Sequence, residues 1–249
     1  MRPVGSRAVD GPTTGDAFGE LLRLARGGHD VLGVIERDDG LINVHDPRLY
    51  FTGPDEWDAL DRLACERAVG HVLDVGCGAG RHSLHLQAAG HQVTAIDASP
   101  GACHVARSRG VQRVRQTRLE DVTELGERFD TFLLLGNNLG LLGSPSHAQA
   151  VLAALAAVAT PDARILGRNR DPYVTDDPVH TAYHAHNRAR GRLGGQARIR
   201  SRIGTLADPW FDYLLCSRDE LVQLLAGSPW RLAAFDSDGP GYLAELRLR

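Results

Sequence analysis

The sequence predicts an α/β protein whose main domain is a doubly wound, mostly parallel sheet with helices on both faces. A short apolar strand, residues 72–75, runs into three glycines at alternate positions and then directly into a helix. Apolar and helical segments then alternate as far as residue 167, which is typical of parallel βαβ units. The last two apolar segments, 230–236 and 242–248, flank a Gly- and Pro-containing turn and predict a terminal antiparallel hairpin.

Length and composition indicate an ordinary globular protein. The chain has 249 residues, which suits one α/β domain with an appendage, and 43% of them are hydrophobic and 24% charged. The longest wholly apolar run, residues 151–159, is far shorter than the roughly 20 residues of a membrane span. No secretion signal opens the chain, so we expect a cytoplasmic protein without membrane attachment.

Cysteine usage and charge narrow the function classes further. Four scattered cysteines without a CxxC pair indicate reduced thiols and suggest neither a disulfide framework nor a zinc site. The net charge of −3 does not favour a dedicated nucleic-acid binder, which would usually be basic.

The first seventy residues are expected to form a tail and a cap. Residues 1–15 lack periodicity and predict a flexible tail. Residues 16–70 predict a largely helical cap across the mouth of the main domain. Within it we expect a helix over 18–25, a strand pair around the turn Asp39-Gly40, and a second helix over 54–69.

Residues 71–249 form the predicted core. The expected strands after the glycine loop cover 91–97, 111–117, 129–135 and 163–167, in addition to the terminal hairpin. Ser99 and Pro100 predict the start of one helix, and an alanine-rich helix should cover 146–160. Ser217 and Glu220 have capping-box spacing and predict a helix over 217–226.

The periodicity breaks over about 169–215, where we expect an inserted hairpin or small sheet on the substrate side. Arginines alternate with smaller residues at Arg198, Arg200 and Arg202, which predicts a strand with one charged face.

The glycine loop indicates a nucleotide-type ligand. Gly76, Gly78 and Gly80 permit a sharp turn and close approach of a ligand at a helix N-terminus. Their spacing is G-x-G-x-G, not the G-x-G-x-x-G of a dinucleotide site, and a P-loop would need a lysine, which this chain lacks. Asp74 fits a cationic sulfonium ligand better than a pyrophosphate. Asp97, 21 positions after Gly76, lies where an acid accepts hydrogen bonds from ribose hydroxyls.

These residues resemble the class I S-adenosylmethionine-dependent methyltransferases. Asp74 and the three glycines match the first motif of that family, and Asp97 matches its ribose-binding acid. The resemblance implies a Rossmann-like, seven-stranded sheet, S-adenosylmethionine as cofactor and S-adenosylhomocysteine as product. Tyr50 and Trp57 are similar to cap aromatics of the small-molecule members.

The resemblance implies a set of site residues. Many members carry an acid near the adenine after the third strand, where this chain has Arg118, so Leu119 or Glu120 would take that contact. The expected cofactor contacts are Tyr50, Asp74, Gly76, Cys77, Gly78, Gly80, Arg81, Asp97, Ala98, Leu119, Glu120, Gly136 and Asn137. The expected substrate contacts are Trp57, Asn138, Arg170, Tyr173, His184 and Trp210.

The predicted activity is methyl transfer to a small molecule, without a metal. Glu36, Asp39, His45 and His184 are unranked candidates for a general base, and the acceptor atom and oligomeric state stay open. One alternative is an RNA or other macromolecule methyltransferase that uses the arginine face over 190–202. Another is a non-catalytic protein that binds S-adenosylmethionine.

Overall fold

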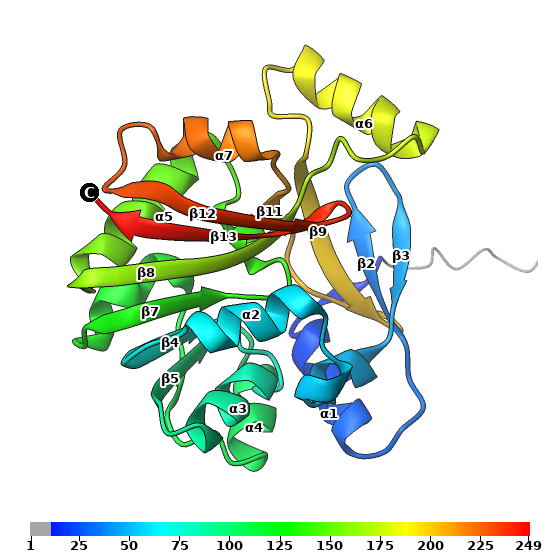
Figure 1. Ribbon diagram of the computed structural model, residues 1–249. Coiled ribbons are helices and arrows are strands. Elements are labelled where there is room, and N and C mark those ends of the chain that lie inside the picture. The colour runs from blue at the N-terminus through cyan, green and yellow to red at the C-terminus, as the bar shows by residue number, and fades with distance from the viewer. Residues whose placement is uncertain (1–10) are drawn as a thin grey trace, which may run out of the picture.

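The computed structural model describes residues 11–249 and contains two sheets (Figure 1). The larger sheet has seven strands in the order β12-β13-β8-β7-β4-β5-β6. Its strands are β4 (His71–Val75), β5 (Gln92–Asp97), β6 (Val114–Gln116), β7 (Phe129–Leu134), β8 (Ala159–Arg170), β12 (Trp230–Asp238) and β13 (Gly241–Leu248).

The larger sheet confirms the predicted α/β architecture. β4, β5, β6, β7 and β8 pair in parallel, whereas β13 pairs antiparallel with both β8 and β12. The chain therefore ends in an antiparallel hairpin on an otherwise parallel sheet, as the turn at 237–241 predicts.

Helices cover both faces of this sheet. Its helices are α2 (Ala59–Arg67), α3 (Arg81–Ala88), α4 (Pro100–Ser108), α5 (Pro145–Ala157) and α7 (Arg218–Leu225). Apolar side chains of α2 and α3 pack with Val72, Val93 and Leu133 on one face. Those of α5 and α7 pack with Leu73 and Phe132 on the other. Successive strand residues point to opposite faces, so a strand such as β4 is apolar throughout.

Two strands of the core differ in length from the prediction. The third covers only Val114–Gln116, and the fifth begins at Ala159, where the end of a helix is predicted. Pro161 and Asp162, interpreted as a turn from their sequence, lie within β8 at a register irregularity between its pairing to Phe129 and to Thr131. A bulge accommodates the missing N–H of proline without ending the strand.

The cap and the insert share the smaller sheet, an arrangement absent from the sequence prediction. β2 (Gly33–Arg37) pairs with β3 (Ile42–His45), which confirms the strand pair predicted around Asp39-Gly40, and also with β9 (Gln196–Ile203) from the insert. β9 also pairs with β10 (Leu206–Ala207) and β11 (Phe211–Leu214), which confirms an inserted hairpin. Figure 1 shows this sheet beside one end of the larger one.

The remaining elements correct further details. Residues 1–10 of the predicted tail lie outside the described residues, and Thr13–Thr14 form β1, paired with β10, so the predicted tail extends too far. The cap also contains α1 (Ala17–Arg26), η1 (Pro47–Phe51) and η2 (Pro54–Glu56), so the helix predicted over 54–69 is divided between η2 and α2.

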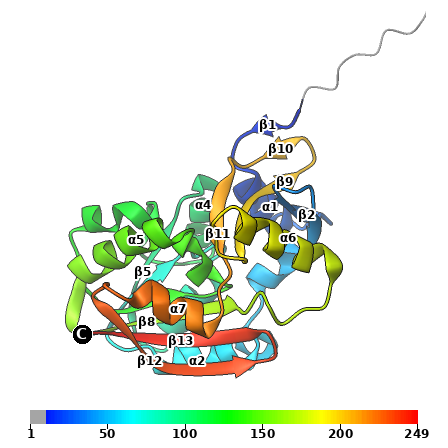
Figure 2. The same cartoon turned by 90° about the horizontal axis from the view of Figure 1, so that it is seen from above.

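The insert contains a helix that the sequence analysis does not predict, α6 (Pro178–Ala189), which lies above the smaller sheet in Figure 1. Seen from above, α1 lies beside α4, where cap and core meet (Figure 2). None of the helices between residues 11 and 249 combines the length and apolar character that crossing a membrane requires.

Candidate functional site

The glycine loop lies at the carboxyl end of β4 and has the backbone that its sequence predicts. Gly76, Gly78 and Gly80 have φ angles of 67°, 54° and 78°, all in the left-handed region that favours glycine. A Cβ at Gly76 would lie 2.5 Å from Nδ2 of Asn138, and that nitrogen donates to the carbonyl oxygens of Val75 and Gly76. Asn138 begins η4 (Asn138–Leu142), which follows β7, and it holds the loop from there; its substrate contact stays a prediction.

Asp97 closes the other side of the loop. Its Oδ2 accepts the N–H of Gly78 at 2.9 Å, and its Oδ1 accepts the N–H of Ser99 at 2.9 Å. The side chain is 8% exposed, and burial raises its pKa to about 6, although the two backbone N–H groups act in the opposite direction. Each oxygen keeps a further lone pair, so the carboxylate can still accept hydrogen bonds from a ligand.

Asp74 is a second buried carboxylate behind the loop. It accepts a hydrogen bond from the hydroxyl of Ser83 in α3 at 2.5 Å, and burial raises its pKa. Two buried carboxylates at the ends of the neighbouring strands β4 and β5 make the region attractive to a cation and unfavourable for a pyrophosphate.

Aromatic side chains of the cap cover the loop. A Cβ at Gly78 would lie 3.5 Å from the ring of Tyr50 and 3.7 Å from that of Phe18. These rings meet edge to face with centroids 5.2 Å apart, and the ring of His45 lies 5.0 Å from Tyr50 on another side. Tyr50 therefore lies against the loop, where the sequence analysis expects it, and α1 supplies a second aromatic residue, Phe18, that the sequence analysis missed.

The end of β7 contributes a strained residue. Asn137 has a φ of 67°, and no other non-glycine residue in the described part of the chain has a positive φ. Its carbonyl oxygen accepts the hydroxyl of Tyr213 in β11 at 2.6 Å, and its Oδ1 is buried without a hydrogen-bond partner among residues 11–249. Tyr213 thus fixes this loop from the insert, a role that the sequence analysis did not assign to it.

The Tyr213→Phe variant is expected to loosen the loop after β7. Loss of the hydroxyl leaves the Asn137 carbonyl without its partner and lowers the free energy of unfolding by about 1 kcal/mol. Hydrogen exchange of the amides over 136–140 should rise. Tyr183→Phe is the matched control, because its hydroxyl bonds to Asp38 at 2.6 Å on the outer part of the insert. Equal exchange at 136–140 in the two variants would contradict this role of Tyr213.

A buried charge cluster connects the cap helix α2 to the start of α3. Asp61, 3% exposed, accepts hydrogen bonds from Arg81 at 2.7 Å and His82 at 3.2 Å, and Arg168 lies 3.5 Å away. Burial raises the pKa of Asp61, but the hydrogen bond from His82 and the nearby positive charges hold it below its usual range. Arg81, a predicted cofactor contact, is thereby turned toward the cap.

Trp57 packs on this cluster. Its indole is 4% exposed, lies 4.7 Å from the ring of His82, and donates to the carbonyl oxygen of Thr52. A side chain enclosed in this way stabilises the cap, and its substrate contact stays a prediction.

The residues expected near an adenine lie beyond β5 and β6. Leu119 is buried at the start of η3 (Leu119–Leu125), whereas Glu120 pairs with Arg118 at 3.1 Å. Ala98 follows Asp97 and is exposed, and Cys77 is a buried thiol within the glycine loop. The ligand contacts of these four residues stay predictions.

The predicted substrate residues of the insert contact other residues of the insert and α7, and their substrate contacts stay predictions. Tyr173 packs edge to face on His184 at 5.6 Å and donates a hydrogen bond to Glu220 of α7. Arg170 is exposed at the end of β8. Trp210 lies under the guanidinium of Arg200 at 4.4 Å.

The arginine face of β9 is largely neutralised. Glu36 accepts hydrogen bonds from Arg200 at 2.9 Å and Arg202 at 3.2 Å, and these partners hold its pKa below the usual range against the effect of burial. Only Arg198 of the alternating arginines is well exposed, so the face offers less charge to nucleic-acid phosphate than the sequence suggests.

Asp16, at the start of α1, was also missed. Its carboxylate caps α1 and accepts hydrogen bonds from Ser99 and Gly101 at the start of α4, each at 2.7 Å. An aspartate just before a helical pattern is a capping signal, but nothing in the sequence shows that it caps two helices.

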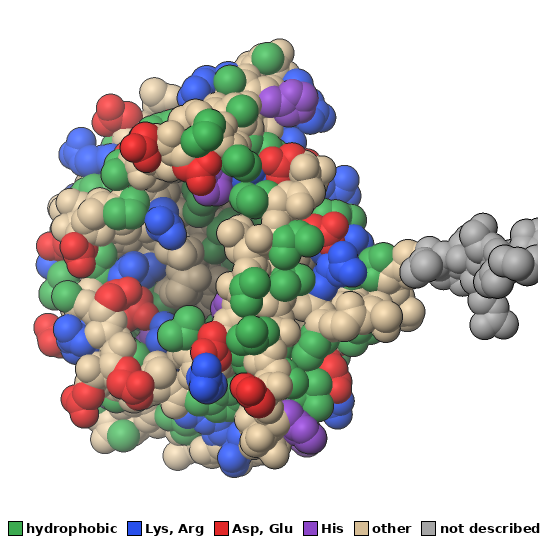
Figure 3. Space-filling model, turned by 90° about the vertical axis from the view of Figure 1, so that its right-hand side faces the viewer, with side chains coloured by type: hydrophobic (Ala, Val, Ile, Leu, Met, Phe, Trp, Pro, Cys, Tyr) green, Lys and Arg blue, Asp and Glu red, His purple; other side chains and the backbone are tan. Residues whose placement is uncertain are grey.

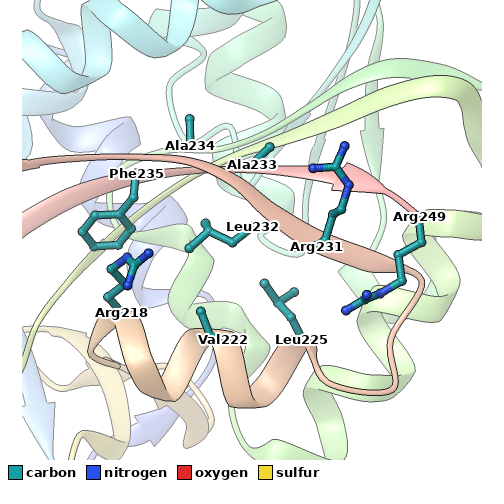
Figure 4. A pocket seen from close by; sticks show the side chains of 9 residues that line it. All are labelled: Arg218, Val222, Leu225, Arg231, Leu232, Ala233, Ala234, Phe235 and Arg249. Carbon is teal, nitrogen blue, oxygen red and sulfur yellow. The ribbon is translucent and has the colours of Figure 1, made fainter.

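The surface of the molecule has two hollows in different places. A space-filling view toward the β2–β3 side shows one that is bordered by arginine and histidine side chains (Figure 3). Another, of about 520 Å³, lies between α7 and β12 and is lined by residues such as Val222, Leu232 and Phe235 (Figure 4). None of its lining residues belongs to the glycine loop or the cap, so its size does not make it the functional site.

Comparisons with known proteins agree with this geometry. The family described as "Methyltransferase domain" matches residues 72–162. A solved structure of a SAM-dependent methyltransferase from Bacteroides fragilis, in complex with S-adenosyl-L-homocysteine, superposes with a TM-score of 0.80 at 26% identity and covers 94% of each chain.

Two curated relatives match over shorter stretches. Malonyl-[acyl-carrier protein] O-methyltransferase of Salmonella typhimurium is 36% identical over 84 residues, 34% of this chain and 33% of that protein. Ubiquinone biosynthesis O-methyltransferase of Azorhizobium caulinodans is 39% identical over 69 residues, 26% of this chain and 27% of that protein. The match thus spans about a third or less of these relatives.

The family match covers β4 through the start of β8, which includes the whole glycine loop and Asp97, and the structural match extends over the cap and the insert. Together, the family match, the structural match and the curated relatives support a class I S-adenosylmethionine-dependent methyltransferase.

Proposed function

We propose that the protein transfers a methyl group from S-adenosylmethionine to a small-molecule acceptor. The observation that carries this proposal is the arrangement at Gly78, whose N–H is bonded to Asp97 while its Cα faces Tyr50. Here a buried carboxylate suited to ribose hydroxyls, a glycine that a ligand can approach closely and an aromatic ring that covers the loop lie together.

The residues present fit S-adenosylmethionine. Asp97 would accept the ribose hydroxyls, and the carboxylate of Asp74 favours a positively charged ligand nearby. Asn137 Oδ1 and His45 Nε2 are buried without partners among residues 11–249, so the site retains hydrogen-bonding groups for a ligand. The B. fragilis structure contains the corresponding demethylated product.

When bound, S-adenosylmethionine supplies an electrophilic methyl group on a cationic sulfur. The protein's own contribution is to orient the cofactor and the acceptor and to enclose them. Tyr50 and Phe18 cover the glycine loop and would exclude water there, and Asp97 would hold the ribose. Alignment of two reactants in this way can supply roughly 7–11 kcal/mol of the barrier.

Several features support a small acceptor rather than RNA. The net charge is −3, and Glu36 neutralises much of the β9 arginine face. The curated relatives are O-methyltransferases named for malonyl-[acyl-carrier protein] and for ubiquinone biosynthesis.

Calorimetry with S-adenosylmethionine and S-adenosylhomocysteine tests the cofactor, followed by a screen of small hydroxyl and amino compounds for S-adenosylhomocysteine formation. Binding with turnover supports the proposal. Failure to bind either compound would refute it, and binding without turnover on any acceptor class would favour the non-catalytic alternative. Salt-sensitive binding of RNA would favour the macromolecular one.

Affinity for S-adenosylhomocysteine is expected to fall as the pH is lowered through about 6, where Asp97 takes up a proton. A protonated carboxyl has less capacity to accept the ribose hydroxyls. The folded-state pKa lies above the ordinary value, so Asp97 itself stabilises the ligand-free fold as the pH falls from 6 toward 4. Titrations in matched buffers should show the decline in the parent and little in Asp97→Asn; equal affinity at pH 8 and pH 5.5 would contradict it.

A further inference from the structure

His45 has a ring nitrogen that the protein leaves without a partner. Its Nε2 is buried, and no hydrogen-bonding group among residues 11–249 reaches it. An unpaired buried polar atom costs roughly 1–3 kcal/mol. Such an atom beside a ligand site indicates that a ligand group completes it.

The side chain of His45 lies on the inner side of the cap. In the pairing of β2 with β3, His45 is opposite Gly33, and Gly33 packs directly on Leu21 of α1. The preceding residue, Val44, is 69% exposed on the other side of the strand. His45 therefore points toward Tyr50 and, beyond it, toward the glycine loop.

Its surroundings keep the imidazole neutral. Burial lowers the pKa of His45, and only the neighbouring carboxylate of Asp46 acts against this effect. Asp46 is exposed and already paired with Arg48. The ring of Tyr50 is the other group packed on His45, and burial keeps that phenol protonated by raising its pKa. A neutral imidazole with a free nitrogen is a proton acceptor near pH 7.

The other three candidate bases are held in ion pairs or packed among other side chains. Glu36 is bonded to two arginines, and Asp39 is paired with Arg37 at 2.6 Å, with its pKa lowered by that contact. His184 is 6% exposed and packed between Tyr173 and His180 on the insert. Of the four, His45 alone contacts an aromatic residue that covers the glycine loop.

We propose that Nε2 of His45 faces the position of the transferred methyl group and receives the proton of an acceptor that still carries one, such as an alcohol, a phenol or an ammonium. This role rests on the proposed function. Nε2 takes the proton as the acceptor's lone pair forms the bond to the methyl carbon, and the electrons of the broken carbon–sulfur bond stay on sulfur. The imidazolium then releases its proton to water.

A substrate-free experiment tests this placement by comparing two ligands. S-adenosylhomocysteine has nothing at the methyl position, whereas sinefungin carries an amine on carbon there. In His45→Phe, sinefungin should bind about 10-fold or more weakly, because a charge-assisted hydrogen bond contributes about 1.5–3 kcal/mol, while S-adenosylhomocysteine changes little. In the parent, the preference for sinefungin should also fall as His45 is protonated at low pH.

His104→Phe, at an exposed position of α4, is the matched control and should leave the ratio of the two affinities unchanged. His45→Leu, which also lacks a hydrogen-bond acceptor, serves if His45→Phe does not fold. An unchanged ratio in the folded His45 variants, or an equal change with His104→Phe, would overturn the assignment while the cofactor proposal stands. No binding of S-adenosylhomocysteine by the parent would overturn both.

Discussion

Asp97→Ala is expected to weaken S-adenosylhomocysteine binding by at least about 100-fold, since each hydrogen bond to a charged group contributes about 1.5–3 kcal/mol and a ribose offers two. The variant also removes the acceptor of the Gly78 and Ser99 N–H groups, so the loop loses its closure on that side. Calorimetry measures the change directly.

Asp97→Asn is the graded control for this prediction. It keeps one acceptor oxygen and removes the buried charge, but it turns an amide N–H toward one of the two backbone donors. Removal of the buried charge raises the free energy of unfolding, whereas the misdirected amide N–H lowers it. The affinity of Asp97→Asn for S-adenosylhomocysteine should lie between those of the parent and Asp97→Ala. Undiminished binding by Asp97→Ala, with its fold verified by circular dichroism, would refute the ribose contact.

Asp61→Ala is expected to be the most destabilising single substitution in the cap. It removes the carboxylate that Arg81, His82 and Arg168 share; Arg168 keeps Asp58 as a partner, whereas Arg81 has no other acidic partner among residues 11–249. Removal of one partner from a buried ion pair costs about 3–5 kcal/mol. For a chain of this size, Tm should fall by roughly 10 °C, which differential scanning calorimetry can measure.

Asp55→Ala provides the comparison, because Asp55 is an exposed carboxylate on the neighbouring η2. It should change Tm by no more than a degree or two, since surface substitutions usually stay within about 0.5 kcal/mol. Similar values of Tm for the two variants would show that the cluster does not stabilise the cap.

Local patterns predict the core well and the cap–insert sheet poorly. The glycine loop, the position of Asp97 and the terminal hairpin each depend on a few consecutive residues, and all three are confirmed as structural features. The pairing of β2 with β9 joins residues more than 160 positions apart, and no local propensity encodes it. Asp177 followed by Pro178 is a helix-start pattern for α6, but the Arg-, Gly- and His-rich residues around it show no helical periodicity.

Some residues of the site can also be identified from local sequence, and others cannot. Its acids and glycines are identifiable because strand ends and tight turns restrict residue type. Tyr213 and Phe18 are not, because an aromatic residue in a helix or strand has the same pattern whether it packs in a core or against a ligand loop. The sequence alone also leaves the four candidate bases unranked, because their ion pairs and burial depend on the tertiary fold.

The sheet shared by the cap and the insert also has a consequence for synthesis on the ribosome. Val34 of β2 has Arg202 of β9 as its partner. At roughly 5–20 residues per second, the β2–β3 hairpin must wait on the order of ten seconds before its neighbour is translated. Until then one edge of β2 is open to pairing with other nascent chains, a hazard that holdase chaperones relieve.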